Sequence, residues 1–434
     1  MENNLSGLLR KLIPLDQLDW IHQVADTASE LGFPIYIVGG FVRDLLLGHP
    51  SLDFDLVVEG NAIALARSLA SKFGGKITTH EKFKTAKWHI RELGIGDRES
   101  NSDPRIPNLD FLDLISARSE IYKHPAALPT VKLGTIHDDI FRRDFTINTL
   151  TIRLDGNHFG QLHDELRGLD DLQKGLIRVL HSHSFVDDPT RMFRAVRYEQ
   201  RYGFEIAKET LALIPEACEW IEKLSPQRIR RELDLTLDEP NADSMLSRLD
   251  KLGLLKPIHP SLRWDKVSQT RFESATDFPL GFSSSGLSNI RDLRWLLWLM
   301  TLSNKVIASL NRRLHFTAPL LKSLLASSKL QSDLPVFSNL KPSQCVERFD
   351  KFPLQAIYAV LRAAPRGKSK QVLETYLMEW RHIKPGTTGN DLKKLGIEPG
   401  PRYQTILRKL RTAWLDGEVK NANEEKNLLQ KILD

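Results

Sequence analysis

The fold is decided by the stretch PIYIVGGFVRDLLLGHPSLDFDLVV, which spans residues 34–58. It begins with a short β-rich run, passes through Gly39 and Gly40 into a helical pattern, and ends in a second β-rich run. This order predicts a strand, a glycine turn, a helix and a second strand. Because side chains two apart in a strand share a face, we expect Asp53 and Asp55 to point the same way.

This pattern suits the binding of a phosphorylated ligand together with a divalent cation. Two carboxylates on one face make an oxygen-rich site of the kind that Mg²⁺ prefers. A turn that leads into a helix presents backbone N–H groups to phosphate oxygens, and Arg43 adds a charged donor. For an isolated pair of aspartates, a polar strand end is the commoner explanation. Here GGFVRD (residues 39–44) and DFD (residues 53–55) occur together, which favours a binding site.

The sequence on either side extends this unit into a mixed sheet. Apolar residues recur at helical spacing over residues 15–31 and 63–73, and further β-rich runs predict strands over residues 76–79, 85–90 and 109–115. After about residue 165 the strand patterns fade and Leu-rich helical patterns continue to the end. Clusters of Gly, Ser, Asn and Pro predict connecting segments over residues 94–107 and 278–288. We therefore predict an α+β fold, in which a mixed-sheet head precedes an elongated all-helical part.

Two further clusters carry charged residues. RRDFTIN (residues 142–148) combines two arginines with polar side chains, and ion pairing at the end of an element is the equal alternative. In DDPTRMFRAVR (residues 187–197), Pro189 suits a first helical turn that Asp187 or Asp188 can cap. One face of that helix is expected to carry Arg191, Arg194, Arg197 and Arg201. Such a basic stripe is usually a solvated face, but Asp188 and Arg191 together can also recognise the edge of a planar base.

The composition excludes several classes of protein. The 434 residues are 41% hydrophobic and 27% charged, an ordinary balance for globular proteins. Lys and Arg (61) exceed Asp and Glu (55), and the net charge of +6 suits a polyanionic partner. Cys218 and Cys345 form no CxxC pair, so we predict neither a disulfide framework nor a zinc ribbon. No apolar run reaches the roughly 20 residues of a membrane span and no export signal is evident, so we expect a cytoplasmic protein.

In order and spacing, these segments resemble the class II tRNA nucleotidyltransferases, which comprise the CCA-adding enzymes and their bacterial poly(A) polymerase relatives. The resemblance covers residues 30–240 closely and the helical remainder more loosely. It implies a polymerase β-like nucleotidyltransferase head, a neck with the base-recognising helix, a body, and a tail that binds tRNA, over residues 1–160, 161–240, 241–365 and 366–434. Two departures are mild: Asp187 stands where the family usually has Glu, and Thr149 where it usually has Ala.

The resemblance also implies roles for individual residues. In this family the DxD pair holds two metal ions, so Asp53 and Asp55 are the expected catalytic and metal-binding residues, with two Mg²⁺ ions as the cofactor. The expected nucleotide-binding residues are Gly39, Gly40, Arg43, Arg143, Asn148, Asp188, Arg191, Arg194 and Arg197. The implied reaction is template-independent transfer of nucleotides from CTP and ATP to the 3′ end of tRNA, with release of pyrophosphate. The expected partners are thus tRNA, CTP and ATP, without a membrane or an identifiable protein partner.

Family members differ in what they add: CCA, CC only, A only, or poly(A). Residues 117–131 resemble the flexible loop that helps the site switch from C to A, which argues against CC-only addition. Residues 79–86 lack the Gly-Arg-Arg-Phe-like run of the bacterial poly(A) polymerases. We therefore predict complete CCA addition and keep A-only addition as the main alternative. A noncatalytic RNA-binding protein and a nucleotidyltransferase for a small molecule are weaker alternatives, because the first needs no paired carboxylates and the second needs no long basic helical part.

The C-terminal segment GTTGNDLKKLGIEPGP (residues 386–401) contains glycine turns that can offer backbone N–H groups to RNA phosphates. An amphipathic helix follows, and its cations are Arg402, Arg408, Lys409 and Arg411. These cations favour attraction to RNA that does not depend on its sequence. A structural helical hairpin with solvated basic residues is the equal alternative.

Overall fold

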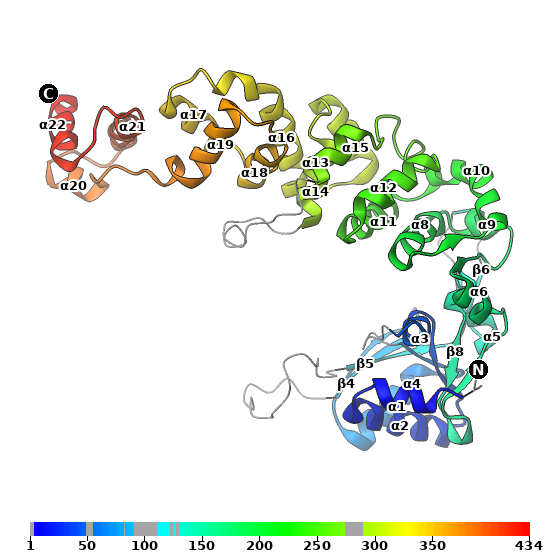
Figure 1. The fold of residues 1–434 in the computed structure, drawn as a ribbon. Coiled ribbons are helices and arrows are strands. Elements are labelled where there is room, and N and C mark those ends of the chain that lie inside the picture. Colours follow the sequence, from blue (N-terminus) through cyan, green and yellow to red (C-terminus); the bar gives the residue numbers. More distant parts are fainter. Residues whose placement is uncertain are drawn as a thin grey trace. The chain divides into compact units, whose positions relative to one another are not determined.

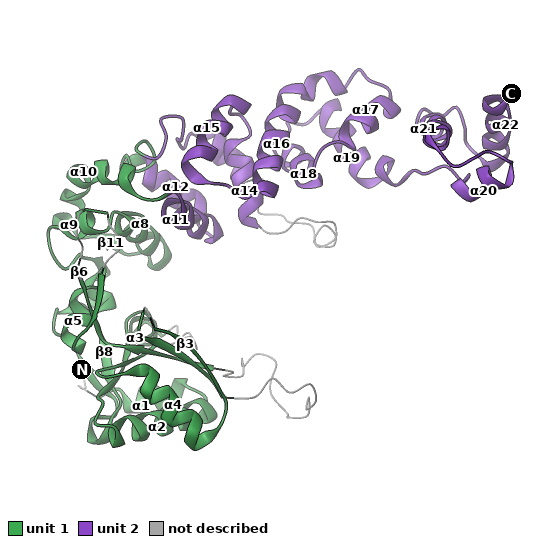
Figure 2. Ribbon diagram, turned by 180° about the vertical axis from the view of Figure 1, so that it is seen from behind, with its two compact units in different colours: residues 1–225, 251–257 green, residues 226–250, 258–434 purple. Residues whose placement is uncertain are grey.

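The computed structural model describes residues 4–48, 55–81, 83–90, 111–121, 125–126, 130–273 and 290–434. Asp53 and the predicted connecting segments at residues 94–107 and 278–288 lie outside the described residues. The chain divides into two compact units, Met1–Ser225 with Lys251–Pro257 and Pro226–Asp250 with Ile258–Asp434 (Figure 2). The expected limits of head, neck, body and tail stay a prediction.

The first unit contains a seven-stranded mixed sheet in the order β3–β4–β5–β2–β1–β8–β9. Its strands are β1 (Ile35–Val38), β2 (Asp55–Val58), β3 (Lys76–His80), β4 (Thr85–His89), β5 (Phe111–Ser116), β8 (Thr151–Arg153) and β9 (Gln161–His163). Strands β2 and β5 are parallel, and every other neighbouring pair in the sheet is antiparallel. The predicted strands are confirmed. The three-residue strands β8 and β9 were not predicted, because they are too short to show alternation.

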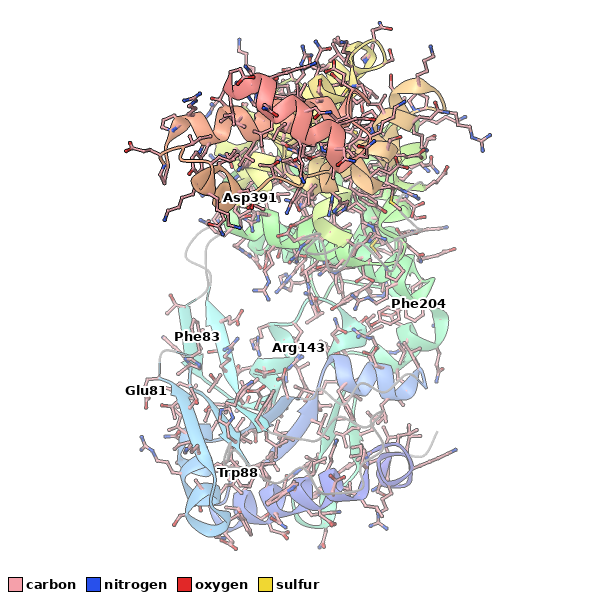
Figure 3. The ribbon with its side chains drawn as sticks, turned by 90° about the vertical axis from the view of Figure 1, so that its left-hand side faces the viewer. Glu81, Phe83, Trp88, Arg143, Phe204 and Asp391 are labelled. Atoms are coloured by element: carbon pink, nitrogen blue, oxygen red, sulfur yellow. The ribbon has the colours of Figure 1, made fainter. Side chains whose placement is uncertain are left out.

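Helices lie on both faces of this sheet. The helices of this part are α1 (Ser6–Leu12), α2 (Leu15–Glu30), α3 (Gly40–Leu46) and α4 (Ala62–Phe73). Helices α1, α2 and α4 lie on one side of the sheet and α3 on the other (Figure 1). Leu56, Leu114 and Trp88 are fully buried on the side of α1, α2 and α4, where the Trp88 ring lies 5.3 Å from that of Trp20 (Figure 3). Strand alternation therefore turns Asp55 toward the opposite face of the sheet, on the side of α3.

The rest of the first unit consists of short elements around the helix of the DDPTRMFRAVR segment. They are β6 (Arg118–Ile121), β7 (Thr130–Leu133), α5 (Ile136–Phe141), η1 (Thr146–Asn148), η2 (Gly156–His158), α6 (Gly168–Lys174), β10 (Leu176–Ile177), α7 (Ser184–Asp187), α8 (Thr190–Tyr202), β11 (Glu205–Ile206), α9 (Lys208–Ala212), α10 (Ile214–Ala217) and η3 (Cys218–Lys223). Strands β6 and β7 form an antiparallel pair and β10 and β11 a parallel one. The two-residue strands β10 and β11 are an exception to the predicted loss of strands after residue 165.

From residue 226 onward, the described regular elements are helices only. They are α11 (Pro226–Asp238), α12 (Ala242–Lys251), α13 (Lys266–Glu273), α14 (Ile290–Leu299), α15 (Asn304–Leu314), α16 (Ala318–Phe337), α17 (Pro342–Phe349), α18 (Leu354–Ala363), α19 (Lys368–Met378), η5 (Trp380–His382), α20 (Gly389–Lys394), α21 (Pro401–Leu415) and α22 (Ala422–Leu433). Trp295 and Trp298 stack at 5.4 Å in the core. Within the described ranges, no helix combines the length and apolarity needed to cross a bilayer. The predicted order, a mixed-sheet head followed by helices, is confirmed.

Candidate active site

The face of the head sheet opposite α1, α2 and α4 carries two neighbouring carboxylates. The strand register pairs Asp55 of β2 with Asp113 of β5, and Asp113 with Lys87 of β4. Asp55 is exposed, whereas the next residue, Leu56, is fully buried, as the predicted alternation requires. The Nζ atom of Lys87 lies 3.2 Å from Oδ2 of Asp113. Asp113 was not predicted as a site residue. It lies between the buried residues Leu112 and Leu114 of β5, so the alternation of this strand gives it the opposite face.

These side chains have the chemistry of a site for a hard divalent cation. Carboxylate oxygens are the ligands that Mg²⁺ prefers, and register brings Asp55 and Asp113 side by side on parallel strands. Among the described residues, no group of three or more His, Cys, Asp or Glu side chains is arranged to hold a metal. Asp53, the other predicted metal ligand, lies outside the described residues, so its part in a metal site stays a prediction.

The turn between β1 and α3 brings Gly39 against an arginine from a distant segment. Antiparallel pairing of Ile37 with Leu56 puts this turn beside the start of β2. Gly39 has φ +71°, and a Cβ atom there would lie 2.3 Å from Nη1 of Arg143. Figure 3 labels Arg143. The Nε atom of Arg143 is buried without a hydrogen-bond partner in the described part of the chain. Glycine at position 39 therefore leaves room for a guanidinium that has a donor to spare.

Arg43 connects this turn to Asn148. Its Nη1 donates to Oδ1 of Asn148 at 2.6 Å, and its Nε and Nη2 donate to Asp44 at 2.8 and 2.9 Å. Its Cζ lies 5.0 Å from the ring centre of Tyr198 and 4.7 Å from that of Tyr202. Burial lowers the pKa of Arg43. The hydrogen bonds to Asp44 and the electrostatic effect of the two tyrosines raise this pKa by more than burial lowers it. Arg43 is thus a permanently charged group in a fixed position, one helical turn after Gly40, the first residue of α3.

Asp144 extends these contacts to α8. Its Oδ1 accepts from Nδ2 of Asn148 at 2.8 Å, and its Oδ2 accepts from Nε of Arg194 at 2.7 Å. Nη2 of Arg194 donates to the Tyr198 hydroxyl at 2.9 Å. Burial raises the pKa of Asp144, but the charge of Arg194 and the hydrogen bonds from Asn148 and Arg194 lower it to about 2. A continuous chain of hydrogen bonds thus runs from Arg43 through Asn148 and Asp144 to α8.

Asp188 and Arg191, the predicted base-recognising pair, make contacts at the start of α8. Oδ1 of Asp188 accepts from the backbone N–H and the hydroxyl of Thr190 at 2.9 and 2.6 Å, as expected for a residue that caps the helix. Nη1 of Arg191 donates to Oγ of Ser184 at 2.6 Å, and its Nη2 donates to the carbonyl oxygen of Arg142 at 2.8 Å. Neither of these arginine contacts was predicted from the sequence.

Three of the four arginines of the predicted basic stripe of α8 are buried or partly buried, whereas the fourth, Arg201, is exposed. Arg191 and Arg197 are 5% and 3% exposed, and Arg194 has 33% of its side chain exposed. The apolar residues of the same helix are also buried, because other elements of the first unit surround it. The structure thus joins Gly39, Arg43, Arg143, Asn148 and Arg194 through direct contacts or hydrogen-bonded neighbours. The part of each predicted residue in nucleotide binding stays a prediction.

The glycine turn of the C-terminal segment is occupied by a carboxylate of the chain itself. Glu425 of α22 is 2% exposed and accepts from the backbone N–H groups of Gly386 and Thr387 at 2.9 and 2.7 Å. It also accepts from the Thr387 hydroxyl and from Nε1 of Trp414. The N–H of Thr388 donates to Asp391 at 3.0 Å. These contacts favour the structural alternative for this turn over phosphate binding.

Family models match two segments of the chain, one within the first unit and one that spans residues of both units. A model described as the poly A polymerase head domain matches residues 35–178. A second model, described as a probable RNA and SrmB-binding site of polymerase A, matches residues 203–265. The chain is 32% identical to the A-adding tRNA nucleotidyltransferase of Halalkalibacterium halodurans, over 97% of this chain and 94% of that protein.

Two further relatives widen the range of activities. The A-adding tRNA nucleotidyltransferase of Geobacter sulfurreducens is 32% identical over 98% of this chain, which spans 48%, about half, of that protein. The CC-adding tRNA nucleotidyltransferase of Deinococcus radiodurans is 29% identical over 98% of this chain and 95% of that protein. The full-length match to some of these proteins thus includes enzymes of both partial activities.

Solved structures agree with the sequence comparisons. The apo form II of a CCA-adding enzyme superimposes with a TM-score of 0.83 at 29% identity, and covers 99% of this chain and 98% of its own. The Thermotoga maritima CCA-adding enzyme in complex with tRNA superimposes with a TM-score of 0.78 at 27% identity, and covers 99% of both chains. The chain therefore belongs to the tRNA nucleotidyltransferase family of A-adding, CC-adding and CCA-adding enzymes.

Proposed function

We propose that this chain transfers AMP from ATP to the 3′-hydroxyl of a tRNA that ends in CC, with release of pyrophosphate. One observation carries the proposal. Asp55 and Asp113 lie on the neighbouring central strands β2 and β5, and the Gly39 turn, with the Arg143 guanidinium beside it, follows β1 next to the start of β2. Carboxylates close to a glycine turn with an arginine beside it suit a nucleoside triphosphate with its metal ions. AMP addition is common to the A-adding relatives and the CCA-adding structural neighbours.

The residues of the chain would divide the work of binding. Arg43 and Arg143 would hold the triphosphate, each kept in place by a carboxylate: Asp44 for Arg43 and Asp139 for Arg143. Asp188 and Arg191 would recognise the base, while Arg194 would orient them from the same helix. Because these groups are held by partners before a ligand binds, positioning of the substrate would supply much of the rate enhancement.

Asp53 and Asp55 would hold two Mg²⁺ ions, with Asp113 as an additional oxygen donor. Such ions, when bound, lower the pKa of an attacking hydroxyl and stabilise the charge on a leaving pyrophosphate. Lys87, which pairs with Asp113, would have to release that carboxylate when a cation takes its place.

Addition of the complete CCA sequence, predicted from the motifs, is the second candidate. It is supported by the structural neighbours that are CCA-adding enzymes, which match 99% of this chain. The loop motif at residues 117–131 also supports it, although residues 122–124 and 127–129 lie outside the described residues.

Three tRNA transcripts, which end before the first C, after C and after CC, distinguish these candidates. Each transcript is incubated with the protein and labelled CTP or ATP. AMP incorporation after CC alone supports the A-adding proposal, and CMP incorporation on the two shorter transcripts adds the CCA activity. Repeated AMP addition to every transcript would indicate a poly(A) polymerase. No incorporation by a protein that binds tRNA would contradict the proposal and favour a noncatalytic RNA-binding protein.

A further inference from the structure

Asp139 of α5 is a buried carboxylate that binds two consecutive arginines. Nε and Nη2 of Arg142 donate to its Oδ1 at 2.9 and 2.7 Å, and Nη2 of Arg143 donates to its Oδ2 at 2.8 Å. Asp139 has no exposed surface. Burial raises its pKa, but the charges of Arg143 and Arg142 and their hydrogen bonds lower it more, so the carboxylate is ionised at neutral pH.

The two arginines bind different oxygens of Asp139 and have different further contacts. Nη1 of Arg142 lies 3.2 Å from Glu120 of β6, a carboxylate whose side chain is 9% exposed. Arg142 is therefore fixed between two carboxylates. On the other side, the guanidinium of Arg143 extends to the turn, where it takes the space that a Cβ atom of residue 39 would need. A change in the position of Asp139 would thus move Arg143 relative to Gly39.

Ion pairs around Asp139 join three arginines to two carboxylates. The groups in these pairs are Arg118, Arg142, Arg143, Glu120 and Asp139. Three cations face two anions, and the buried Nε of Arg143 has no hydrogen-bond partner among the described residues. A buried donor on an excess cation costs free energy unless a ligand satisfies it. An anion at the Gly39 turn would satisfy both the charge and the donor.

We propose that Asp139 is a positioning residue for phosphate binding, which holds the Arg143 guanidinium at the Gly39 turn so that its remaining donors meet the β- and γ-phosphates of a nucleoside triphosphate. The inference rests on the proposed function in one respect, namely that a nucleoside triphosphate binds at this turn. Asp139 itself contacts no ligand and acts through Arg143. Its loss therefore weakens binding of the two terminal phosphates and leaves binding of the nucleoside monophosphate part.

Equilibrium binding of ATP and of AMP to the full chain, without tRNA, tests this inference. We expect Asp139→Asn to weaken ATP binding about tenfold, because hydrogen bonds between charged groups are lost. AMP binding is expected to stay within about twofold. The matched control is Asp138→Asn, which changes the partly exposed neighbouring carboxylate that caps α5 through Thr135; it should leave the ratio of ATP to AMP affinity unchanged. Equal weakening of ATP and AMP by Asp139→Asn, or no weakening, would contradict the inference.

A double variant tests whether Asp139 acts through Arg143. Asp139→Asn added to Arg143→Met should cause no further loss of ATP affinity, because the two changes remove one interaction. A further loss would contradict the inference. If Asp139→Asn does not fold, Asp139→Glu replaces it, because this variant keeps the charge but moves the carboxylate by one methylene. A folded Asp139→Glu variant with the wild-type ratio of ATP to AMP affinity would also contradict the inference. A wild-type chain that binds ATP but adds no AMP to tRNA would overturn the proposed function alone.

Discussion

Two glycine turns in this chain precede short helices, and both resemble phosphate-binding turns in the sequence, yet they differ in what surrounds them. The turn at Gly39 lies against the guanidinium of Arg143 and beside the carboxylates of β2 and β5. The turn at residues 386–388 is bound by the carboxylates of Glu425 and Asp391. A glycine turn is therefore a candidate anion-binding site when cations lie beside it. It has a structural role when a carboxylate of the chain already accepts hydrogen bonds from its N–H groups.

The largest effect should come from removing the carboxylate next to the first turn. Asp55→Asn is expected to lower the rate of AMP transfer by about a thousandfold, because stabilisation by a bound metal is worth several kcal/mol in the transition state. Binding of tRNA should hardly change. Single-turnover transfer and tRNA binding, measured on the same protein, check this, with Asp19→Asn of the exposed surface of α2 as the control. A transfer rate close to wild type in Asp55→Asn would show that Asp55 does not take part in catalysis.

The second prediction compares the two turns with the same substitution. Gly39→Ala would place a Cβ 2.3 Å from Nη1 of Arg143 at φ +71°, so we expect KM for ATP to rise about tenfold or more. Gly386→Ala meets Glu425 atoms at 3.6 and 3.8 Å, which is ordinary contact, and should leave KM unchanged. Steady-state kinetics with both variants checks this. Similar KM values for Gly39→Ala and Gly386→Ala would contradict the assignment of ATP binding to the Gly39 turn alone.

Much of the head was predictable because its signals are local. The alternation that separates Asp55 from Leu56, and the helical spacing of α2 and α4, depend on neighbours in sequence. Asp113 and Asp139 were missed because their importance depends on partners in other segments: the parallel register of β2 with β5 for Asp113, and the approach of Arg143 to Gly39 for Asp139. The tail turn was left undecided for the same reason, since Glu425 lies almost 40 residues after it.

The third prediction concerns the joint at the second turn. Glu425→Gln is expected to destabilise this part of the chain by about 2 kcal/mol, because an amide nitrogen would face N–H donors. Burial raises the pKa of Glu425, but the hydrogen bonds from Thr387, Trp414 and Gly386 lower it below 4.5 overall. Its stabilisation is therefore complete above the ordinary pKa and is lost as the pH falls through the lowered value. Hydrogen exchange over residues 386–388 at neutral and acidic pH measures this, and equal protection in wild type and variant would contradict it.

A fourth prediction tests the helix beside the first turn. Arg191→Ala is expected to reduce the preference of the site between ATP and CTP several-fold, because the predicted donors to the base are lost. Competition between the two nucleotides on one tRNA transcript measures the preference. Lys174→Ala, a change at the end of α6, serves as the control. Unchanged selectivity in a folded Arg191→Ala variant would remove Arg191 from base recognition.

The smallest effect is expected on the surface that follows the second turn. If α21 binds RNA through its side chains rather than through the turn, Arg408→Gln and Lys409→Gln should each weaken tRNA binding a few-fold and reduce the salt dependence of binding by about one charge. Binding measured over a range of salt concentrations checks this. An unchanged slope in both variants would make this helix purely structural.

The most direct test of the central claim is the stoichiometry of the reaction at the first turn. Wild-type protein is given Mg²⁺, labelled ATP and a tRNA transcript that ends in CC, and both the AMP incorporated and the pyrophosphate released are measured. We expect one AMP per tRNA and one pyrophosphate per AMP, with both lost together in Asp55→Asn. Incorporation that persists in Asp55→Asn, or a folded wild-type protein that binds this tRNA and releases no pyrophosphate, would contradict it.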